Sequence, residues 1–415
     1  MKSRARFFAR SLPVLLPVCF LSWTLWADDI EVTNWSRTES LKAHNSADFP
    51  QDPRPSQAAV PESSVIETGP LFPVVKDGKW GYIDNVGKMV ISARYDLAGD
   101  FSEGLAAVRS GHKWGYIDKT GQLVIPFEYF NATRFSDGLA PVRRGETRND
   151  KWGYIDKTGQ MVIPAQYEIA NIFAEGLAAV IYKTHWGYID KTGQMVISHW
   201  NWNFNLQPCT WPGVRVRKDH KFEHLDNVSP MLILLQSCPL ARFSEGLTPA
   251  PSGHRMDKWG YMDKAGRMAI PMKYDFVLDF TEGLAPVMAR AYAFIQKWGF
   301  IDKGGEFVIP PQYSATGRFS EGLAAVKVTK KWGFIEKTGQ MVIPPQYDSA
   351  DEFFEGLAAV TLGDKVGYVD KTGKLAIPLQ YSSAEGFSHG LAEVQVNRKW
   401  GYIDKTGKYV WEPTQ

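Results

Sequence analysis

The chain has few cysteines and almost no excess charge. Its 415 residues include three cysteines, and 47 Lys and Arg face 45 Asp and Glu, so the formal net charge is +2. Proteins that bind nucleic acids usually carry a surplus of basic side chains, because binding neutralises phosphates. The composition therefore argues against a nucleic acid as partner.

Catalytic motifs are also missing. The sequence has no Gly-x-Ser-x-Gly, no His-Glu-x-x-His and no phosphate-binding loop, so it predicts no catalytic residue, no cofactor and no metal centre. His220 and His224, with His199 upstream, come closest to a metal site, because residues four apart in a strand share a face. The simpler interpretation is that these histidines are exposed polar residues in a degenerate strand.

Long apolar runs are confined to the N-terminus. Residues 1–27 contain four basic groups and no acid, and their apolar run ends at Ala27. The run has the length of a signal-peptide core and is short for a bilayer span. We therefore predict a signal peptide and an exported protein, in the periplasm or at the cell surface. An uncleaved anchor, or a lipid on Cys19, would be its one route to a membrane.

The next segment, residues 28–68, is polar and rich in proline without periodicity, which predicts a disordered tether. Removal of the signal peptide would leave two cysteines, Cys209 and Cys238. An even count in an exported protein makes them a candidate disulfide. The alternative is two separate buried thiols.

A repeat fills the rest of the chain. We call the residue at the tryptophan position of each copy its anchor. Phe222 and Val366 are the anchors of two degenerate copies. The ten anchors lie 34 to 39 residues apart, which indicates tandem structural repeats. The other anchors are the Trp-Gly pairs that begin at Trp80, Trp114, Trp152, Trp186, Trp259, Trp298, Trp332 and Trp400.

One copy, Phe101–Arg134, predicts a meander of three short antiparallel strands: GLAAVRS, KWGYID and QLVIP, separated by turn residues and stopped by Pro126. Both faces of these strands are apolar, so each copy must pack between two neighbours. We expect the glycine after each tryptophan to allow close approach of a neighbouring backbone or ring.

An acidic residue follows each anchor by four positions, as Asp118 follows Trp114. Because it begins a turn in every copy, while catalysis needs one unequal pair of acids, we expect it to cap the turn. The Glu of the Glu-Gly-Leu motif, as at Glu103, is likewise expected to be structural.

The repeated string KWGYIDKTGQMVIPPQYD with FSEGLAAV resembles the bacterial WG-repeat family, also called KWG repeats, over roughly Gly69 to Trp411. The resemblance implies an all-β tandem array and little about activity. The pattern is eroded around residues 199–240. Residues 412–415 form a short C-terminal tail.

Ten copies exceed the usual number of blades in a closed propeller, so we predict an open β-superhelix of about ten three-stranded meanders. The alternative is a large closed propeller-like ring.

Two surfaces are candidates for binding. Three insertions, Arg143–Asp150, Pro251–Asp257 and Met288–Gln296, fall in the same turn of the repeat and should lie on one face, and the third carries Tyr292 and Phe294 at an apolar tip. The eroded strip HWNWNFNLQPCTW resembles a glycan-stacking surface. Its candidate residues are Trp200, Trp202, Asn203 and Trp211.

These observations favour an exported, non-enzymatic, monomeric β-repeat scaffold that binds a protein or a cell-wall glycan. The alternatives are an envelope hydrolase with a site in the eroded copy, and a purely architectural spacer.

Overall fold

The structure, a computed structural model, describes residues 69–147, 149–183, 185–198, 242–252, 258–292 and 295–413. Contacts divide the chain into two units, Met1–Val65 and Ile66–Gln415, and all described residues belong to the second. Within them every regular element is a β-strand. No described segment forms a helix that is long and apolar enough to cross a membrane.

The strands form nine small antiparallel sheets, which we number blade 1 to blade 9 in chain order. Blade 1 contains β1 (Phe72–Lys76), β2 (Lys79–Ile83) and β3 (Met89–Tyr95); blade 2 contains β4 (Leu97–Ala98), β5 (Leu105–Ser110), β6 (Lys113–Asp118) and β7 (Leu123–Tyr129). Blade 3 contains β8 (Asn131–Ala132), β9 (Ala140–Arg143), β10 (Trp152–Ile155) and β11 (Met161–Tyr167). Blade 4 contains β12 (Ile169–Ala170), β13 (Ala178–Tyr182), β14 (His185–Ile189) and β15 (Met195–Ser198).

The second half of the unit repeats this plan. Blade 5 contains β16 (Leu247–Pro251), β17 (Trp259–Asp263) and β18 (Met268–Tyr274); blade 6 contains β19 (Phe276–Val277), β20 (Ala285–Tyr292), β21 (Ile295–Ile301) and β22 (Phe307–Tyr313). Blade 7 contains β23 (Ala315–Ser320), β24 (Leu323–Val328), β25 (Lys331–Glu336) and β26 (Met341–Tyr347). Blade 8 contains β27 (Ser349–Phe354), β28 (Leu357–Leu362), β29 (Lys365–Asp370) and β30 (Leu375–Tyr381), and blade 9 contains β31 (Ser383–Ala384), β32 (Leu391–Val396), β33 (Lys399–Asp404) and β34 (Tyr409–Trp411).

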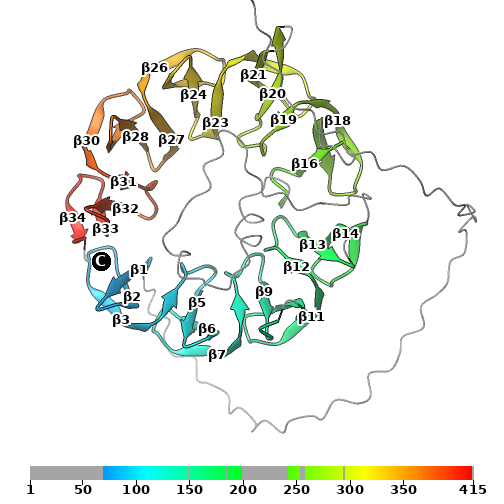
Figure 1. Ribbon diagram of the computed structural model, residues 1–415, viewed down its shortest axis with the longest axis vertical. Helices are drawn as coiled ribbons and strands as arrows, with labels where there is room; N and C mark the ends of the chain where they lie inside the picture. Colours follow the sequence, from blue (N-terminus) through cyan, green and yellow to red (C-terminus); the bar gives the residue numbers. More distant parts are fainter. Residues whose placement is uncertain are drawn as a thin grey trace, which may run out of the picture. The chain divides into compact units, whose positions relative to one another are not determined.

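Each blade is a meander whose strands run outward from the centre of the ring in chain order (Figure 1). The three predicted strands of the repeat are present. Seven blades add a fourth, innermost strand that begins two residues after the outer-strand Tyr, as β8 follows Tyr129. The anchor strand, such as β6, is third of the four in these blades, so one sequence repeat supplies the outer strands of one blade and the inner strands of the next.

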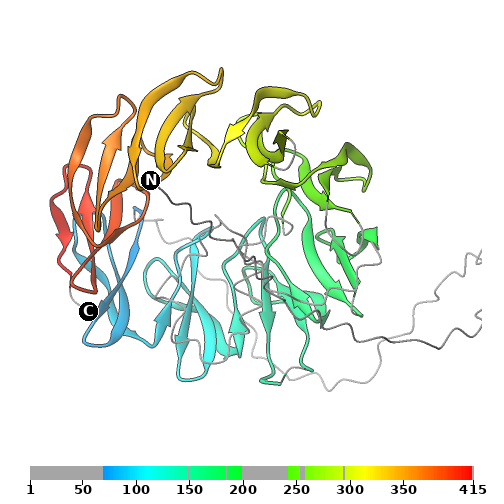
Figure 2. The same cartoon turned by 45° about the horizontal axis from the view of Figure 1, so that its top comes forward.

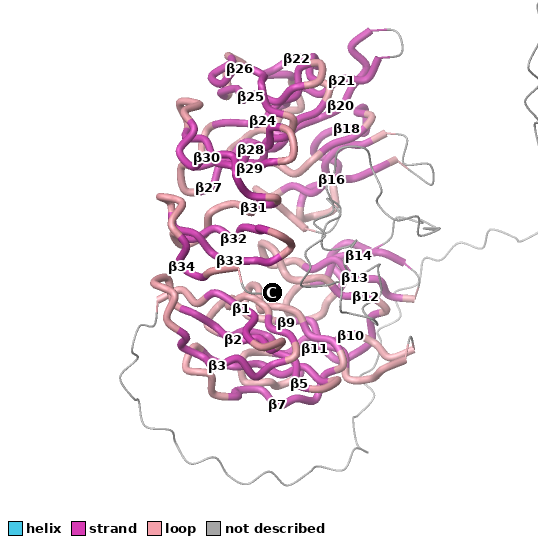
Figure 3. The backbone as a smooth tube through the Cα atoms, turned by 60° about the vertical axis from the view of Figure 1, so that its left-hand side comes forward, coloured by secondary structure: helices cyan, strands magenta, loops and turns pink. Residues whose placement is uncertain are grey.

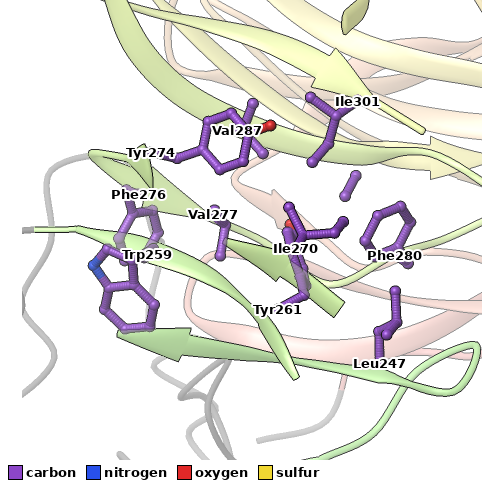
Figure 4. Close-up of a cluster of buried hydrophobic side chains, with 11 residues drawn as sticks. Leu247, Trp259, Tyr261, Ile270, Tyr274, Phe276, Val277, Phe280, Val287 and Ile301 are labelled. Atoms are coloured by element: carbon purple, nitrogen blue, oxygen red, sulfur yellow. The ribbon is translucent and has the colours of Figure 1, made fainter. Parts of the chain in front are cut away.

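The core lies between neighbouring blades. The Tyr two residues after the anchor is fully buried in several copies, and in blade 2 Tyr116 packs against Phe135 of blade 3 in a tilted arrangement, with ring centroids 5.0 Å apart. The Tyr116 hydroxyl donates to the Thr133 carbonyl at 2.8 Å, again across the joint. Figure 4 shows the equivalent cluster between blades 5 and 6, in which Tyr261, Phe280 and Ile301 come together. Each blade therefore buries both faces, as its two apolar faces required.

The blades close into a ring, so the predicted open superhelix is wrong. Blade 9 packs on blade 1: Tyr402 donates to the Pro73 carbonyl at 3.1 Å, and its ring lies 5.6 Å from that of Phe72. Figure 2 shows the two blades, in red and blue, side by side. An open array would leave Phe72 and Tyr402, both buried here, in contact with water at its two ends. Closure of the ring buries both side chains and avoids the free-energy cost of exposing them to water.

The expected count of about ten stacked copies is also wrong for this ring. The copy anchored at Phe222 falls within residues 199–241, outside the described residues, and blades 4 and 5 pack directly on each other. Glu175 of blade 4 accepts a hydrogen bond from the backbone N–H of Gly246 in blade 5 at 2.9 Å, and the rings of Tyr188 and Phe243 meet edge to face, with centroids 5.1 Å apart. No blade therefore lies between them.

Candidate functional site: the turn face of blades 3 to 6

The two ends of the ring differ in what they carry. In every blade the first two long strands are joined at one end, for example between β5 and β6, and we call this end the turn face. The opposite end carries the Asp-x-x-Gly and Glu-Gly-Leu turns, and we call it the latch face. Because Leu105 pairs with Asp118 in the ladder of blade 2, these two motifs share one end of the blade.

The repeated Asp caps its turn, as predicted. Asp118 Oδ1 accepts hydrogen bonds from the backbone N–H groups of Thr120 and Gln122, at 2.9 and 3.0 Å, and from the Thr120 hydroxyl at 2.6 Å. Asp156, Asp190, Asp370 and Asp404 do the same in their own blades. In these four residues the bonds from the turn outweigh burial and lower the pKa of the carboxyl. These carboxylates therefore already accept hydrogen bonds from the turns that they stabilise.

The Glu of Glu-Gly-Leu is structural as well, and it joins neighbouring blades. Glu282 of blade 6 adopts a φ of 52°, accepts the backbone N–H of Gly322 in blade 7 at 3.1 Å and forms an ion pair with Lys337 at 3.1 Å. We call this arrangement of carboxylate, Gly N–H and Lys a latch. It recurs with Glu103, Glu175, Glu245, Glu321 and Glu355, and Asp137 makes the Gly contact between blades 3 and 4.

A chain of charges centred on the buried Asp279 crosses four consecutive blades, and the sequence analysis did not find it. Arg318 in β23 pairs with Asp279 of blade 6 and with Glu352 of blade 8, each at 3.1 Å, and Arg242 lies 3.8 Å from Asp279. The signal was present, because each of these residues directly precedes the Phe of its repeat.

Asp279 is the most enclosed member of this chain. It is 5% exposed, and its Oδ1 atom has no hydrogen-bond partner within the described part of the chain. Burial raises its pKa, although Arg318 and Arg242 oppose the shift. Burial lowers the pKa of Arg318, but Glu352 and Asp279 outweigh it and leave the pKa raised. The arrangement has the character of a structural ion-pair network, in which each charge is balanced by its neighbours.

The departures from regular repeat length gather on the turn face of blades 3 to 6. The insertions Arg143–Asp150, Pro251–Asp257 and Met288–Gln296 join β9 to β10, β16 to β17 and β20 to β21. Residues 199–241 leave from the end of β15 in blade 4, which lies at the same face. The predicted placement of the three insertions on a single face is confirmed by the strand order, because each lies between the first two long strands of its blade.

The insertion in blade 6 extends a hairpin. The ladder between β20 and β21 continues to the pairs Arg290–Gln296 and Tyr292–Ile295, so the strands themselves are longer than in the other blades. Figure 3 shows this hairpin projecting beyond the rest of the ring. Tyr292 is its last described residue before the tip, and Phe294 lies outside the described residues. The expected apolar loop is therefore an extended two-stranded ribbon.

The insertion in blade 3 is held against its surroundings. Asp150 accepts hydrogen bonds from the backbone N–H and the hydroxyl of Thr147, both at 2.8 Å, and Arg143 donates to the Thr147 carbonyl at 3.3 Å. Arg144 forms an ion pair with Glu128 of blade 2 at 3.2 Å. This loop thus has a defined conformation and is anchored to the neighbouring blade.

The other candidate residues from the sequence lie outside the described residues. These are Trp200, Trp202, Asn203 and Trp211 of the glycan-like strip, the metal candidates His220 and His224, and the candidate disulfide Cys209–Cys238. The predicted signal peptide and tether fall there too. In the described ranges, no group of three or more His, Cys, Asp or Glu residues could hold a metal ion.

The fold and the repeats together define the class of protein: a nine-bladed β-propeller built from tandem repeats. The WG containing repeat matches residues 80–114, 114–147, 152–182, 186–199, 259–289, 298–332, 332–365 and 367–400. The chain belongs to this family, as its motifs predicted. The degenerate copy at Phe222 is not among the matches.

No curated protein matches the chain. Solved structures that resemble it include tricorn protease (11% identity, 75% of this chain and 35% of that chain, TM-score 0.23) and puromycin hydrolase (11%, 80% and 55%, TM-score 0.35). A third is dihydro-heme d1 dehydrogenase NirN in complex with DHE (12%, 84% and 74%, TM-score 0.40). The chain thus spans only about a third to about half of the first two. At these identities and TM-scores, the resemblance supports no statement about the activity of this chain.

Proposed function

We propose that the protein is an exported, non-enzymatic propeller scaffold that binds a protein partner through the turn face of blades 3 to 6. The observation that carries this proposal is the clustering of the three insertions on one face, in blades 3, 5 and 6 of the nine blades. Exposed turns tolerate insertions anywhere, so neutral drift would scatter them around the ring. Selection for one binding surface would gather them.

The chemistry of the described groups on this face suits a protein partner. The β20–β21 ribbon offers a projecting pair of hydrogen-bonded strands, and the blade 3 insertion adds exposed charges of both signs at Arg144 and Glu146. A protein interface combines charged contacts with apolar ones at its centre, and the sequence of the ribbon supplies Tyr292 and Phe294 for the apolar part. The repeated carboxylates of the latch face are already engaged, which leaves them unsuited to serve as general acids or bases.

A pull-down with residues 69–415 against solubilised envelope proteins and against purified peptidoglycan tests the proposal. We expect capture of a protein that is lost with Phe294→Ala or Tyr292→Ala in the blade 6 ribbon. The matched control is Asp364→Ala, which lies in the two-residue turn between β28 and β29 of blade 8 and should leave capture intact. Binding that the control removes as strongly would contradict the proposed face.

Two other outcomes would replace the proposal. Co-sedimentation with peptidoglycan that is lost with Trp202→Ala would make the protein a wall-binding array. Absence of any partner would favour an architectural spacer. Export is tested separately by sequencing the N-terminus of the protein recovered from the cell envelope, which we expect to begin after Ala27.

A further inference from the structure

The joint between blade 9 and blade 1 lacks all three groups of the latch. Ladder registers place Leu71 where Leu105 stands in blade 2, so Pro70 takes the position of the Gly that donates its N–H. His389, with a φ of 52°, takes the position of the Glu, and Asn85 takes that of the Lys in the Asp-x-x-Gly turn. Proline has no N–H, and asparagine has no charge. The ion pair and the backbone bond of a latch therefore cannot form here. The joint between blades 1 and 2 lacks only the carboxylate, because Gly69 takes the position of the Glu while Gly104 and Lys119 are present.

The outer part of this joint is also reduced. Strand β34 has three residues, whereas its equivalents β3, β7 and β11 have seven each. In blades 2 and 3 the turn glycine packs on an Ile of the preceding blade, as Gly159 packs on Ile125, but Gly87 of blade 1 packs on the backbone of Val410. Among the described strands β34 is thus the shortest outer strand, followed by β15 of blade 4 with four residues, while the Val410 backbone still lies close to Gly87.

Chain connectivity singles out the same joint. Every other pair of neighbouring blades is consecutive in the chain, as β3 of blade 1 leads into β4 of blade 2. Blades 9 and 1 lie at opposite ends of the repeat array, and neither contributes a strand to the sheet of the other. Separation at this joint breaks no sheet and stretches no connection.

We propose that the ring opens and closes at the joint between blade 9 and blade 1. The opening exposes Phe72 and Val74 on one side and Leu391 and Tyr402 on the other, which form one buried cluster in the closed ring. The Tyr402 hydroxyl, which donates to the Pro73 carbonyl, stabilises the closed state.

Hydrogen exchange of backbone amides in the full chain, followed by mass spectrometry, tests whether the ring opens at this joint. In the native protein we expect the amides of β1, β2 and β33 to exchange about tenfold faster than those of β25 and β26 in blade 7. Equal rates in the two regions would overturn the proposal.

A pair of variants separates opening of the ring from fraying of the chain ends. Tyr402→Phe removes the bond across the unlatched joint, and Tyr368→Phe removes the equivalent bond to Glu385 at the latched joint between blades 8 and 9. Opening predicts that Tyr402→Phe accelerates exchange about fivefold on both sides of the joint, in β1 and β2 as well as in β33. Acceleration confined to blade 9, or an equal acceleration at the latched joint with Tyr368→Phe, would overturn the proposal.

Discussion

At the scale of single residues, the position after each tryptophan requires a glycine because the outer strand passes close over it. In blade 2 the ladder shifts register between Trp114 and Tyr116, and the outer strand bulges over Gly115. A Cβ atom on Gly115 would lie 2.6 Å from the Ile125 carbonyl oxygen and 3.0 Å from the Pro126 backbone. The prediction that this glycine permits close approach of a backbone is therefore confirmed.

Replacement of this glycine should destabilise the ring through that contact. We expect Gly115→Ala to lower the free energy of unfolding by about 2 kcal/mol, because the bulged strand must shift to make room. Urea unfolding followed by tryptophan fluorescence measures the change. Gly99→Ala is the matched control, since a Cβ there would lie 3.5 Å from the Ala107 carbonyl oxygen, at ordinary contact distance. A loss as large in the control would refute the steric explanation.

The charge chain makes a second residue-scale prediction. Arg318→Met removes the cation shared by Asp279 and Glu352 and leaves Asp279 buried with weaker compensation. We expect a loss of about 3 kcal/mol in the free energy of unfolding near neutral pH. Arg134→Met, at the equivalent exposed position of blade 3, should cost less than about 0.5 kcal/mol.

The pH dependence of the Arg318→Met loss provides a further check. The pKa of Asp279 is already raised by burial, and removal of Arg318 takes away an opposing influence and raises it further. A group whose folded pKa lies above its unfolded value destabilises the protein above the unfolded pKa. The loss should therefore shrink as the pH falls and Asp279 takes up a proton. A loss that stays constant between about pH 7 and about pH 4 would contradict this account.

At the scale of elements, the latches couple neighbouring blades from blade 2 to blade 9 and make stability depend on pH. The pKa values of Glu175, Glu321 and Glu355 are lowered from the usual 4.5: burial alone would raise them, and the Lys and backbone N–H groups outweigh it. Because the folded pKa lies below the unfolded one, the stabilisation is present above about pH 4.5 and is lost as the pH falls through the folded pKa.

Acid should consequently weaken the ring before it unfolds completely. We expect the free energy of unfolding to fall steadily below about pH 4.5 and to change little between about pH 6 and about pH 8. Urea titrations across this range measure it. A triple variant with Glu175, Glu321 and Glu355 each changed to Gln should show a flatter pH profile, and an unchanged profile would mean that other carboxyls dominate.

At the scale of the whole molecule, residues 199–241 should be dispensable for the ring, because blades 4 and 5 meet without them. We expect a chain in which residues 201–240 are replaced by a Gly-Ser linker of about ten residues to fold, with a midpoint of thermal unfolding within a few degrees of the original. Circular dichroism follows the transition. A variant that aggregates or loses its cooperative transition would show that this segment supports a blade.

Local features of the fold were within reach of sequence reasoning. Turn caps such as Asp118, the close approach at Gly115, the three-stranded meander and the burial of both faces all follow from short-range patterns that each copy repeats. The latch was half visible: Glu103 was expected to be structural, but its partners Gly138 and Lys157 lie in the next blade. Contacts between copies depend on which copies pack together. The position of Asp279, Arg318 and Glu352 before the Phe of each repeat was visible in the sequence, but their pairing across blades was not.

The sequence by itself determined the repeat, its strands, its turns and its family, because these depend on residues close together in the chain. Only the tertiary structure decided that the blades close, that the ring has nine of them and that blade 5 follows blade 4 directly. Closure depends on the angle between neighbouring blades, and that angle is set by the packing of rings such as Tyr116 on Phe135 summed around the whole ring. A small change at each joint would accumulate into an open array. No single repeat contains that information.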